Sequence, residues 1–183
     1  MMKFHSTTLN DAWLIELEPR GDQRGYFART MCQEEFEKHG LINRFVQQNT
    51  SFSAQRGTLR GLHYQTPPYG EAKLVRCLRG AIVDVIVDIR KGSSTYLQHQ
   101  MFELTDRNMY QLYVPPGFAH SFQTLNDNVE VSYLVSTAYN PEAERGLNYR
   151  DEQLGIDWPI PVTVVSEKDS SWPLISEHTQ PLY

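Results

Sequence analysis

The sequence lacks the features that mark secreted, membrane-spanning and nucleic-acid-binding proteins. Its 183 residues include two cysteines, Cys32 and Cys77, which are too few for a disulfide framework and have no zinc-ligand spacing. No apolar run approaches membrane-spanning length, and the first residues show no signal-peptide pattern. The formal net charge of -5 argues against nucleic acids and anionic membrane surfaces, which attract a basic face. We expect a cytoplasmic protein whose partner is neither a nucleic acid nor a membrane, although a local arginine cluster could still bind a small anion.

Helical patterns are scarce as well. The hydrophobic content of 40% is ordinary for a globular protein, and ten prolines with eleven glycines indicate frequent turns. Only 34–39 has helical composition, with Gly40 placed to cap it. The length favours a single domain over 1–183, with an irregular or helical tail from about residue 172.

Short strand-like stretches occupy most of the chain. The clearest period lies in 81–89, where every odd position is apolar and Asp84 and Asp88 lie at even positions, so one face is expected to be buried. Strands at this regular spacing, with almost no helix between them, predict a sandwich or a jelly-roll barrel. The other predicted strands are 13–17, 25–31, 45–53, 58–65, 72–78, 97–104, 111–114, 129–135 and 162–165.

The stretch Leu59–Gln65 places an arginine and a histidine three residues apart. Histidine takes up a proton near neutral pH, and arginine holds phosphate by paired hydrogen bonds. A core histidine beside a solvated arginine is the structural alternative. In a regular strand Arg60 and His63 would face opposite sides. Either a bulge at Gly61 re-aims the side chains, or Arg60 faces another surface, and the sequence leaves both options open.

Two polar side chains share the parity of apolar neighbours in predicted strands. Lys73 has the parity of Val75 and Cys77, and Tyr133 has the parity of Val131, so both are expected to point inward. A buried lysine or phenol without a partner is costly. A polar ligand would satisfy both groups, and the alternatives are a buried carboxylate for the lysine and a backbone group for the tyrosine.

A metal-ligand pattern is only half present. Pro115–His120 brings a second histidine after a tight turn, as in the later motif of metal-binding cupins. The earlier motif has His63 but no second ligand histidine nearby, so we predict no metal site. Near the end of the chain, Asp169 follows the last predicted strand, where a carboxylate could orient a histidine.

Five short motifs occur in a fixed order. They are Asp22–Phe27, Gln47–Ser51, Leu59–Gln65, Pro115–His120 and Ser166–Asp169. Together they resemble the motifs of the dTDP-4-dehydrorhamnose 3,5-epimerase family, which are cupin-like sugar-nucleotide epimerases. The resemblance covers most of the chain, from about residue 13 to residue 172, and the ordered set is more specific than any single motif.

The resemblance implies a jelly-roll (cupin-like) antiparallel barrel with a few short helices, assembled as a homodimer. It also implies an isomerase that converts a nucleotide sugar, dTDP-4-dehydro-6-deoxy-D-glucose, to dTDP-4-dehydro-L-rhamnose by inverting C3 and C5 without a metal or redox cofactor. The 4-ketone acidifies the protons on both carbons. Inversion therefore requires a base on one face, an acid on the other and a group that stabilises the enolate.

By match to the family, the resemblance assigns roles to individual residues. His63 is the expected base, and Asp169 is its orienting partner. Tyr133 is the expected acid, and Lys73 is the cation near the enolate oxygen. Arg60 would clamp the pyrophosphate. The other expected substrate-binding residues, some of them supplied across a dimer interface, are Arg24, Phe27, Arg29, Gln47, Asn49, His120, Tyr139 and Lys168.

Three places depart from the family pattern. Arg29 stands where the family usually has a glutamate near the nucleotide end, Gln48 replaces an aspartate, and 146–150 differs from the usual Gly-Ile-x-Trp-Asn. None of these changes removes an expected proton-transfer residue. They bear on which nucleotide is bound, and possible substrates include CDP- and GDP-linked 4-keto sugars.

Other functions stay open at this point. A 3- or 5-mono-epimerase or a ketoisomerase would use the same base and acid. A metal-dependent cupin would use His63, Glu71 and His120 as ligands. A non-catalytic sugar-nucleotide binder would need no acid-base pair.

Overall fold

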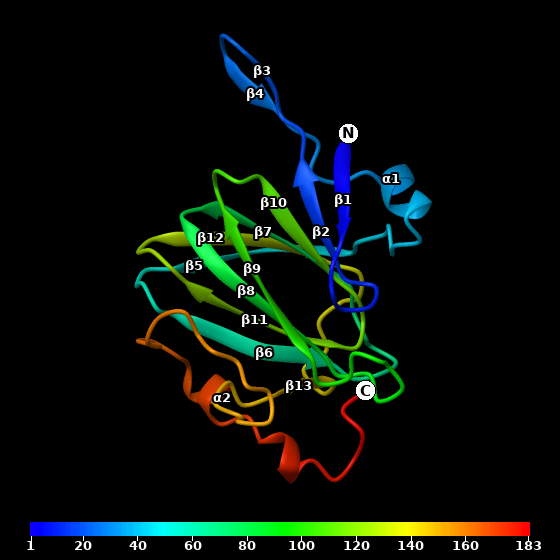
Figure 1. The fold of residues 1–183 in the computed structure, drawn as a ribbon, viewed down its shortest axis with the longest axis vertical. Coiled ribbons are helices and arrows are strands. Elements are labelled where there is room, and N and C mark those ends of the chain that lie inside the picture. The colour runs from blue at the N-terminus through cyan, green and yellow to red at the C-terminus, as the bar shows by residue number, and fades with distance from the viewer.

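Two antiparallel sheets face each other in the computed structural model, which describes residues 1–183 (Figure 1). The strands of the six-stranded sheet are β1 (Met2–Ser6), β2 (Trp13–Leu17), β5 (Gln47–Ser53), β7 (Lys73–Arg79), β10 (Tyr110–Val114) and β12 (Val129–Val135). Those of the five-stranded sheet are β6 (Leu59–Gln65), β8 (Ala81–Asp88), β9 (His99–Thr105), β11 (Phe118–Thr124) and β13 (Glu144–Gly146). Their spatial orders are β1-β2-β10-β7-β12-β5 and β13-β6-β11-β8-β9. The predicted mainly β jelly roll is confirmed.

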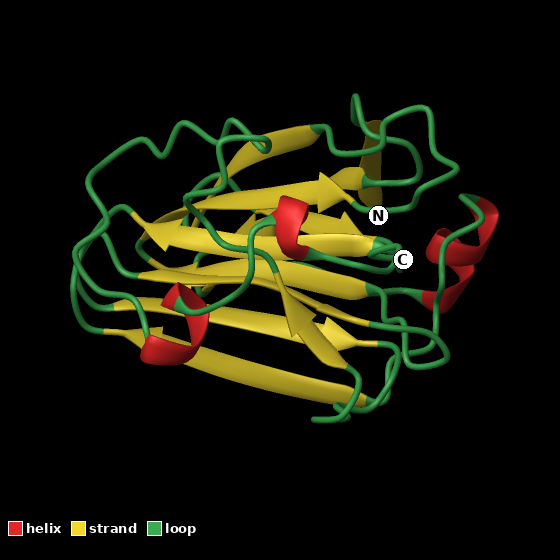
Figure 2. Cartoon of the chain, turned by 90° about the horizontal axis from the view of Figure 1, so that it is seen from below, coloured by secondary structure: helices red, strands yellow, loops and turns green.

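The helices are short and lie outside the sheets (Figure 2). The helix α1 spans Gln33–Lys38, α2 spans Glu167–Ser170, and a 3-10 helix spans Ile175–Glu177. The predicted helix at 34–39 is thus confirmed, and Gly40 follows its end with a φ of 70°, which suits glycine. None of these helices has the length and apolarity to cross a membrane.

The main core lies between the inner faces of the two sheets. Val75 and Cys77 of β7 belong to the same buried cluster as Ile82 and Ile86 of β8 and Phe122 of β11. Burial of each large apolar side chain contributes roughly 1.5–3 kcal/mol to stability. This cluster fixes the distance between the sheets, and therefore the distance between polar side chains that point inward from them.

The C-terminal part of the chain covers the outer face of the five-stranded sheet, below β6 and β13 in Figure 1. Leu147 and Leu154 belong to one buried cluster with Val87 of β8 and with Ile89, which follows β8. Both faces of β8 are therefore buried, and the prediction of a single buried face is wrong. Alternation along a strand reports which positions are polar, but it does not report which segment of the chain covers them.

A hairpin of β3 (Arg20–Asp22) and β4 (Gly25–Phe27) projects beyond the sheets (Figure 1). All its strand residues are exposed. The predicted strand at 25–31 is correct only as far as Phe27, because the chain leaves the hairpin there.

Two further differences concern strand assignment. The strand β1 has no counterpart among the predicted strands. The predicted strand at 162–165 is wrong, because this segment makes only one parallel bridge, between Thr58 and Val164. Its apolar residues pack on the outer face of the sheet without joining it.

Candidate active site

His63 and Asp169 form a hydrogen-bonded pair between β6 and α2. His63 Nε2 lies 2.6 Å from Asp169 Oδ1, and the Gly61 amide donates to Asp169 Oδ2 at 3.1 Å. The Ser166 hydroxyl caps α2 by accepting a hydrogen bond from the Asp169 amide. Burial favours the neutral acid, but the contacts with His63 and Gly61 outweigh it and keep the pKa of Asp169 below its ordinary value. The ionised carboxylate holds a proton on Nε2 and leaves Nδ1 as the ring nitrogen that can act as a base.

A β-bulge at Gly61 turns Arg60 and His63 toward one cavity. His63 of β6 lies opposite His120 of β11. Three residues earlier, Arg60 lies opposite Phe122, which is only two residues further along β11, so β6 carries one extra residue. A Cβ at Gly61 would lie 2.6 Å from the carbonyl oxygen of His120, and the φ of 122° also requires glycine. The bulge is thus the correct one of the two options that the sequence leaves open.

Lys73 and Tyr133 reach the same cavity from the six-stranded sheet. The parity prediction is confirmed, since Lys73 is buried and Tyr133 packs against the main core. Lys73 Nζ lies 3.3 Å from Glu71 Oε1, so a carboxylate balances its charge. Burial raises the pKa of Tyr133, and the negative charge of Glu71 raises it further. The phenol is therefore kept protonated, which is the form required of a general acid.

These side chains surround two adjoining cavities of about 470 and 430 Å³. His63, Lys73 and Tyr133 line both of them, with the imidazole on one sheet and the ammonium and phenol on the other. Cavities of roughly 300–1,000 Å³ suit ligands with several rings. The other predicted site residues found in the lining are Gln47, Asn49 and Tyr139 in the first cavity, and Arg60, His120 and Asp169 in the second.

Glu144 lines the first cavity and was not predicted as a site residue. It accepts a hydrogen bond from the Tyr139 hydroxyl at 2.7 Å and forms an ion pair with Lys168. Burial raises the pKa of Glu144, but Lys168 and Tyr139 outweigh burial and lower it. Lys168 thus contacts the site through Glu144. No sequence pattern points to this residue, because a glutamate in the polar stretch 140–145 is typical of a solvated turn.

His120 is held at the wall of the second cavity by a buried carboxylate. Its Nε2 lies 2.9 Å from Oδ2 of Asp84 on β8. Both residues are buried, and Asp84 is completely inaccessible. His120 is therefore fixed in place. This pairing explains why the inward face of β8 carries an acid, Asp84.

Arg24, Phe27 and Arg29 are not brought to these cavities within one chain. Arg24 pairs with Asp22 on the exposed hairpin, and Phe27 is 67% exposed. Arg29 lies just beyond the hairpin, 3.9 Å from Glu35 of α1. Of the predicted substrate-binding residues, these three depend on a second copy of the chain if they are to contact a ligand in the cavities.

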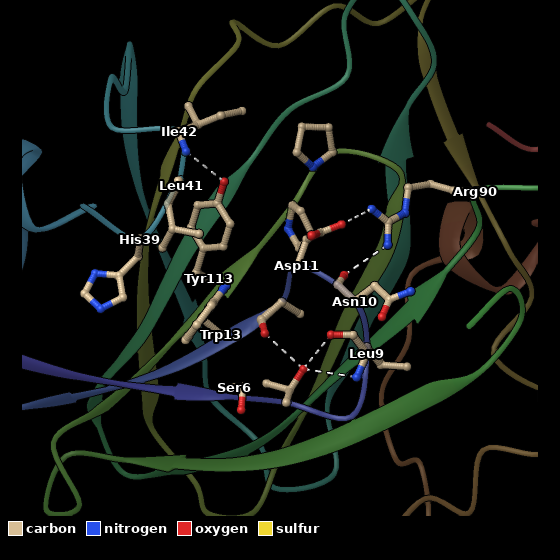
Figure 3. Close-up of a pocket in the computed structure, with 15 residues that line it drawn as sticks. Ser6, Leu9, Asn10, Asp11, Trp13, His39, Leu41, Ile42, Arg90 and Tyr113 are labelled. Carbon is tan, nitrogen blue, oxygen red and sulfur yellow. Dashed lines mark hydrogen bonds and ion pairs between the residues drawn. The ribbon is translucent and has the colours of Figure 1, made fainter. Parts of the chain in front are cut away.

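A further cavity of about 500 Å³ lies between β2, β10 and the end of α1, and it contains none of the predicted site residues (Figure 3). Its arginine, Arg90, donates to Asp11 at 2.7 Å and to the Asn10 carbonyl at 3.0 Å, and it also pairs with Asp88. The charged groups there satisfy one another. This cavity contains none of the four residues His63, Asp169, Tyr133 and Lys73.

The ligand set of the metal-dependent alternative is not assembled. His63 faces Asp169, His120 faces Asp84, and Glu71 faces Lys73. The structure holds no group of three or more histidine, cysteine, aspartate or glutamate side chains that could bind a metal ion. Each histidine is instead paired with its own carboxylate.

Comparison with known proteins agrees with this geometry. Residues 6–177 match the family model described as dTDP-4-dehydrorhamnose 3,5-epimerase. The chain belongs to this family. A relative from Sinorhizobium fredii, named dTDP-4-dehydrorhamnose 3,5-epimerase, is 46% identical over 96% of this chain and 91% of its own length. The chain is thus an epimerase, a member of the isomerase class.

Two solved structures of the family share the fold closely. The epimerase from Bacillus anthracis, solved with TDP and PPi bound, superposes with a TM-score of 0.93 at 41% identity, covering 96% of this chain and 100% of that one. The enzyme from Legionella pneumophila, in complex with dTDP-4-keto-L-rhamnose, has a TM-score of 0.91 at 39% identity, covering 97% and 94% of the two chains.

Proposed function

We infer that this chain converts dTDP-4-dehydro-6-deoxy-D-glucose to dTDP-4-dehydro-L-rhamnose by inverting C3 and C5. The observation that carries the proposal is the placement of His63 with Asp169 on one sheet and of Tyr133 with Lys73 on the other, around shared cavities. Two stereocentres next to one ketone require a base and an acid on opposite faces of the sugar.

The first step is removal of a proton from the carbon next to the ketone. His63 Nδ1 takes this proton, and the C–H electron pair moves into the ring to form an enolate whose charge lies on the C4 oxygen. The ammonium of Lys73 stabilises that oxygen. Asp169 stabilises the imidazolium and holds the ring in the required tautomer.

In the second step, Tyr133 returns a proton to the same carbon from the opposite face. The enolate collapses to the ketone with inverted configuration, and the tyrosine is left as a phenolate beside Lys73. One proton has moved onto His63 and one has left Tyr133. Exchange of both groups with water restores the starting state before the second carbon reacts.

The nucleotide end of the substrate is anionic, and Arg60 is the exposed cation on the wall of the second cavity. Its guanidinium is oriented by the Ser53 hydroxyl at 3.1 Å and the Phe52 carbonyl at 3.0 Å. Arginine suits a diphosphate because its planar fork donates paired hydrogen bonds. The ligands in the Bacillus anthracis and Legionella pneumophila structures, TDP and a dTDP sugar, support this assignment.

A homodimer completes the proposed site. The strand β5 is an edge of its sheet, and its residues Gln47 and Asn49 line the first cavity. Exposed sheet edges are suited to pairing with another chain. The projecting hairpin carries exposed aromatic and basic residues that line neither of these cavities in their own chain. We place the hairpin of one protomer over the cavities of its partner, where Arg24, Phe27 and Arg29 contact the nucleotide.

The reaction is tested by incubation with dTDP-4-keto-6-deoxyglucose in deuterated water, with NMR detection of the C3 and C5 protons. The proposal predicts loss of both proton signals and formation of dTDP-4-dehydro-L-rhamnose. Loss of one signal would make the enzyme a mono-epimerase with the same acid and base. No exchange with the dTDP sugar, but exchange with a CDP- or GDP-linked sugar, would contradict the assigned nucleotide.

A further inference from the structure

The indole of Trp172 lies against the His63–Asp169 pair, although none of the assigned roles includes it. Its ring centroid lies 6.2 Å from that of His63, with the planes at 72°, which is an edge-to-face contact. On its other side the indole packs on Gly146, where a Cβ would lie 2.3 Å from the ring. Gly146 is also paired with His63 between β13 and β6. The missing side chain at Gly146 thus makes room for an indole beside the imidazole.

The backbone and a charged neighbour hold the indole in this position. Asn148 Nδ2 donates to the Trp172 carbonyl at 2.9 Å, and the Asn148 amide donates to the Pro173 carbonyl at 3.1 Å. Lys168 Nζ lies 5.7 Å from the indole centroid, within cation-π range. Because Lys168 is paired with Glu144, the indole also lies next to the ion pair at the first cavity.

The indole nitrogen itself is buried and makes no hydrogen bond. A buried N–H without a partner is costly, so packing alone does not account for its position. Burial raises the pKa of Asp169, while His63, Gly61 and, as a smaller contribution, the Trp172 N–H lower it. The indole N–H thus favours the ionised carboxylate, although it forms no hydrogen bond with it.

We propose that Trp172 is a positioning residue for the His63–Asp169 pair. Its ring fixes the plane of the imidazole and shields it from water on the side away from the substrate, and its N–H supports the ionised Asp169. This inference rests on the proposed function, in which His63 takes the proton. The charged or titratable groups around the indole are His63 on β6, Lys168 and Asp169 on α2, and Glu144 on β13, which acts through Lys168.

The test compares Trp172→Ala with Trp172→Phe in the full-length enzyme. Trp172→Ala removes the wall and the N–H, so kcat should fall about 10- to 100-fold, as expected when a base loses its orientation. The Kd for dTDP should stay within about twofold of the wild-type value, because the indole contacts the His63–Asp169 pair and not the nucleotide end of the substrate. Trp172→Phe restores the ring and should recover most of kcat. Trp158→Phe is the matched control, since the indole of Trp158 donates a hydrogen bond to the Tyr149 carbonyl and lines neither cavity.

A pH profile and a spectroscopic signal separate positioning from general stability. In Trp172→Phe the favourable effect of the indole N–H on ionised Asp169 is lost, so the acid limb of the kcat/KM profile should move to higher pH. Protonated imidazole quenches a neighbouring indole. The fluorescence of the wild-type enzyme should therefore contain a component that decreases as the pH is lowered. This component should be absent in both Trp172→Phe and His63→Asn.

Either of two results would overturn the proposal. One is a wild-type kcat in Trp172→Ala. The other is an unchanged acid limb in Trp172→Phe together with a fluorescence titration that survives in His63→Asn. Failure of the underlying function has a different signature, because His63→Asn would then keep full turnover whatever the tryptophan variants do.

Discussion

Each proposed proton-transfer residue has a charged neighbour. Asp169 stays ionised because His63 and the Gly61 amide outweigh the effect of burial, and it directs the free nitrogen of His63 toward the substrate. Glu71 raises the pKa of Tyr133 and also balances Lys73 at 3.3 Å. The proposed acid is therefore kept protonated while the carboxylate that orients the proposed base stays ionised, as the mechanism requires.

Tyr133→Phe should separate the two half-reactions. His63 can still remove a proton in this variant, but no acid remains on the opposite face, so inversion should slow by about 10²- to 10⁴-fold. In deuterated water, substrate recovered from the reaction should carry deuterium with its original configuration. Tyr110→Phe, a tyrosine of β10 outside both cavities, is the control. Rapid inversion by Tyr133→Phe would mean that another group is the acid.

Glu71→Gln should move the basic limb of the activity profile. The pKa of Tyr133 is raised, so activity persists until the pH passes through that raised value and is lost above it. Removing the negative charge of Glu71 lowers the pKa of Tyr133, and the loss should then begin at lower pH. Glu103→Gln, an exposed change on β9, should leave the profile unchanged. A basic limb that does not move would show that Glu71 does not act on the phenol.

At the scale of elements, the bulge in β6 brings Arg60, the proposed anion-binding residue, to the same cavity as His63, the proposed base. Without the extra residue at Gly61, Arg60 and His63 would point to opposite faces of the strand. The bulge is accommodated because β11 passes so close that only glycine fits at this position. The same turn of backbone directs the Gly61 amide to Asp169.

Gly61→Ala should therefore damage both stability and activity. The new Cβ would lie 2.6 Å from the His120 carbonyl oxygen at a φ of 122°, so the strands must separate. We expect a loss of about 1–3 kcal/mol in the free energy of unfolding, measured by urea denaturation, together with a large fall in kcat. Gly92→Ala, at a position with open space around it, is the matched control. Equal stability of the two variants would contradict the need for the bulge.

The sequence predicts the strands better than their surroundings. Local alternation is enough to locate β12 at Val129–Val135 and to point Lys73 and Tyr133 inward. It fails for β8, whose second face is covered by residues some sixty positions later, such as Leu147. It also fails at 162–165, where apolar residues pack against a sheet without pairing. Burial by distant segments is not encoded in a local period.

For the whole molecule, the residues of the candidate site divide between those that one chain assembles and those that it does not. The ordered motifs were sufficient to predict His63, Asp169, Tyr133 and Lys73, which the fold brings together. Glu144 was missed because only the pairing of β13 with β6 brings it to the cavity. The exposed hairpin, with Arg24 and its neighbours, reaches neither of the two candidate-site cavities of its own chain. These facts favour a site shared between two protomers.

Mixed dimers test this sharing directly. Co-expression of His63→Ala with Arg24→Ala, under two affinity tags, gives dimers that carry one variant of each kind. If the hairpin serves the partner's cavity, each mixed dimer has one intact site, and purified mixed dimers should recover roughly half of the wild-type kcat per dimer. If the hairpin serves its own chain, both sites of every mixed dimer are defective and no activity returns. A monomeric wild-type enzyme in sedimentation experiments would also contradict the shared site.

The most direct test of the account is the behaviour of His63→Ala. Both turnover of the dTDP-4-keto sugar and solvent exchange at C3 and C5 should fall by about 10²-fold or more, because the other basic groups that the five-stranded sheet brings to the cavities, His120 and Glu144, are held by Asp84 and Lys168. The Kd for dTDP should stay nearly unchanged, since the nucleotide end is assigned to Arg60 and its neighbours. Loss of exchange with intact dTDP binding is the predicted result. Undiminished exchange in His63→Ala would contradict the assignment of the base and, with it, the proposed mechanism.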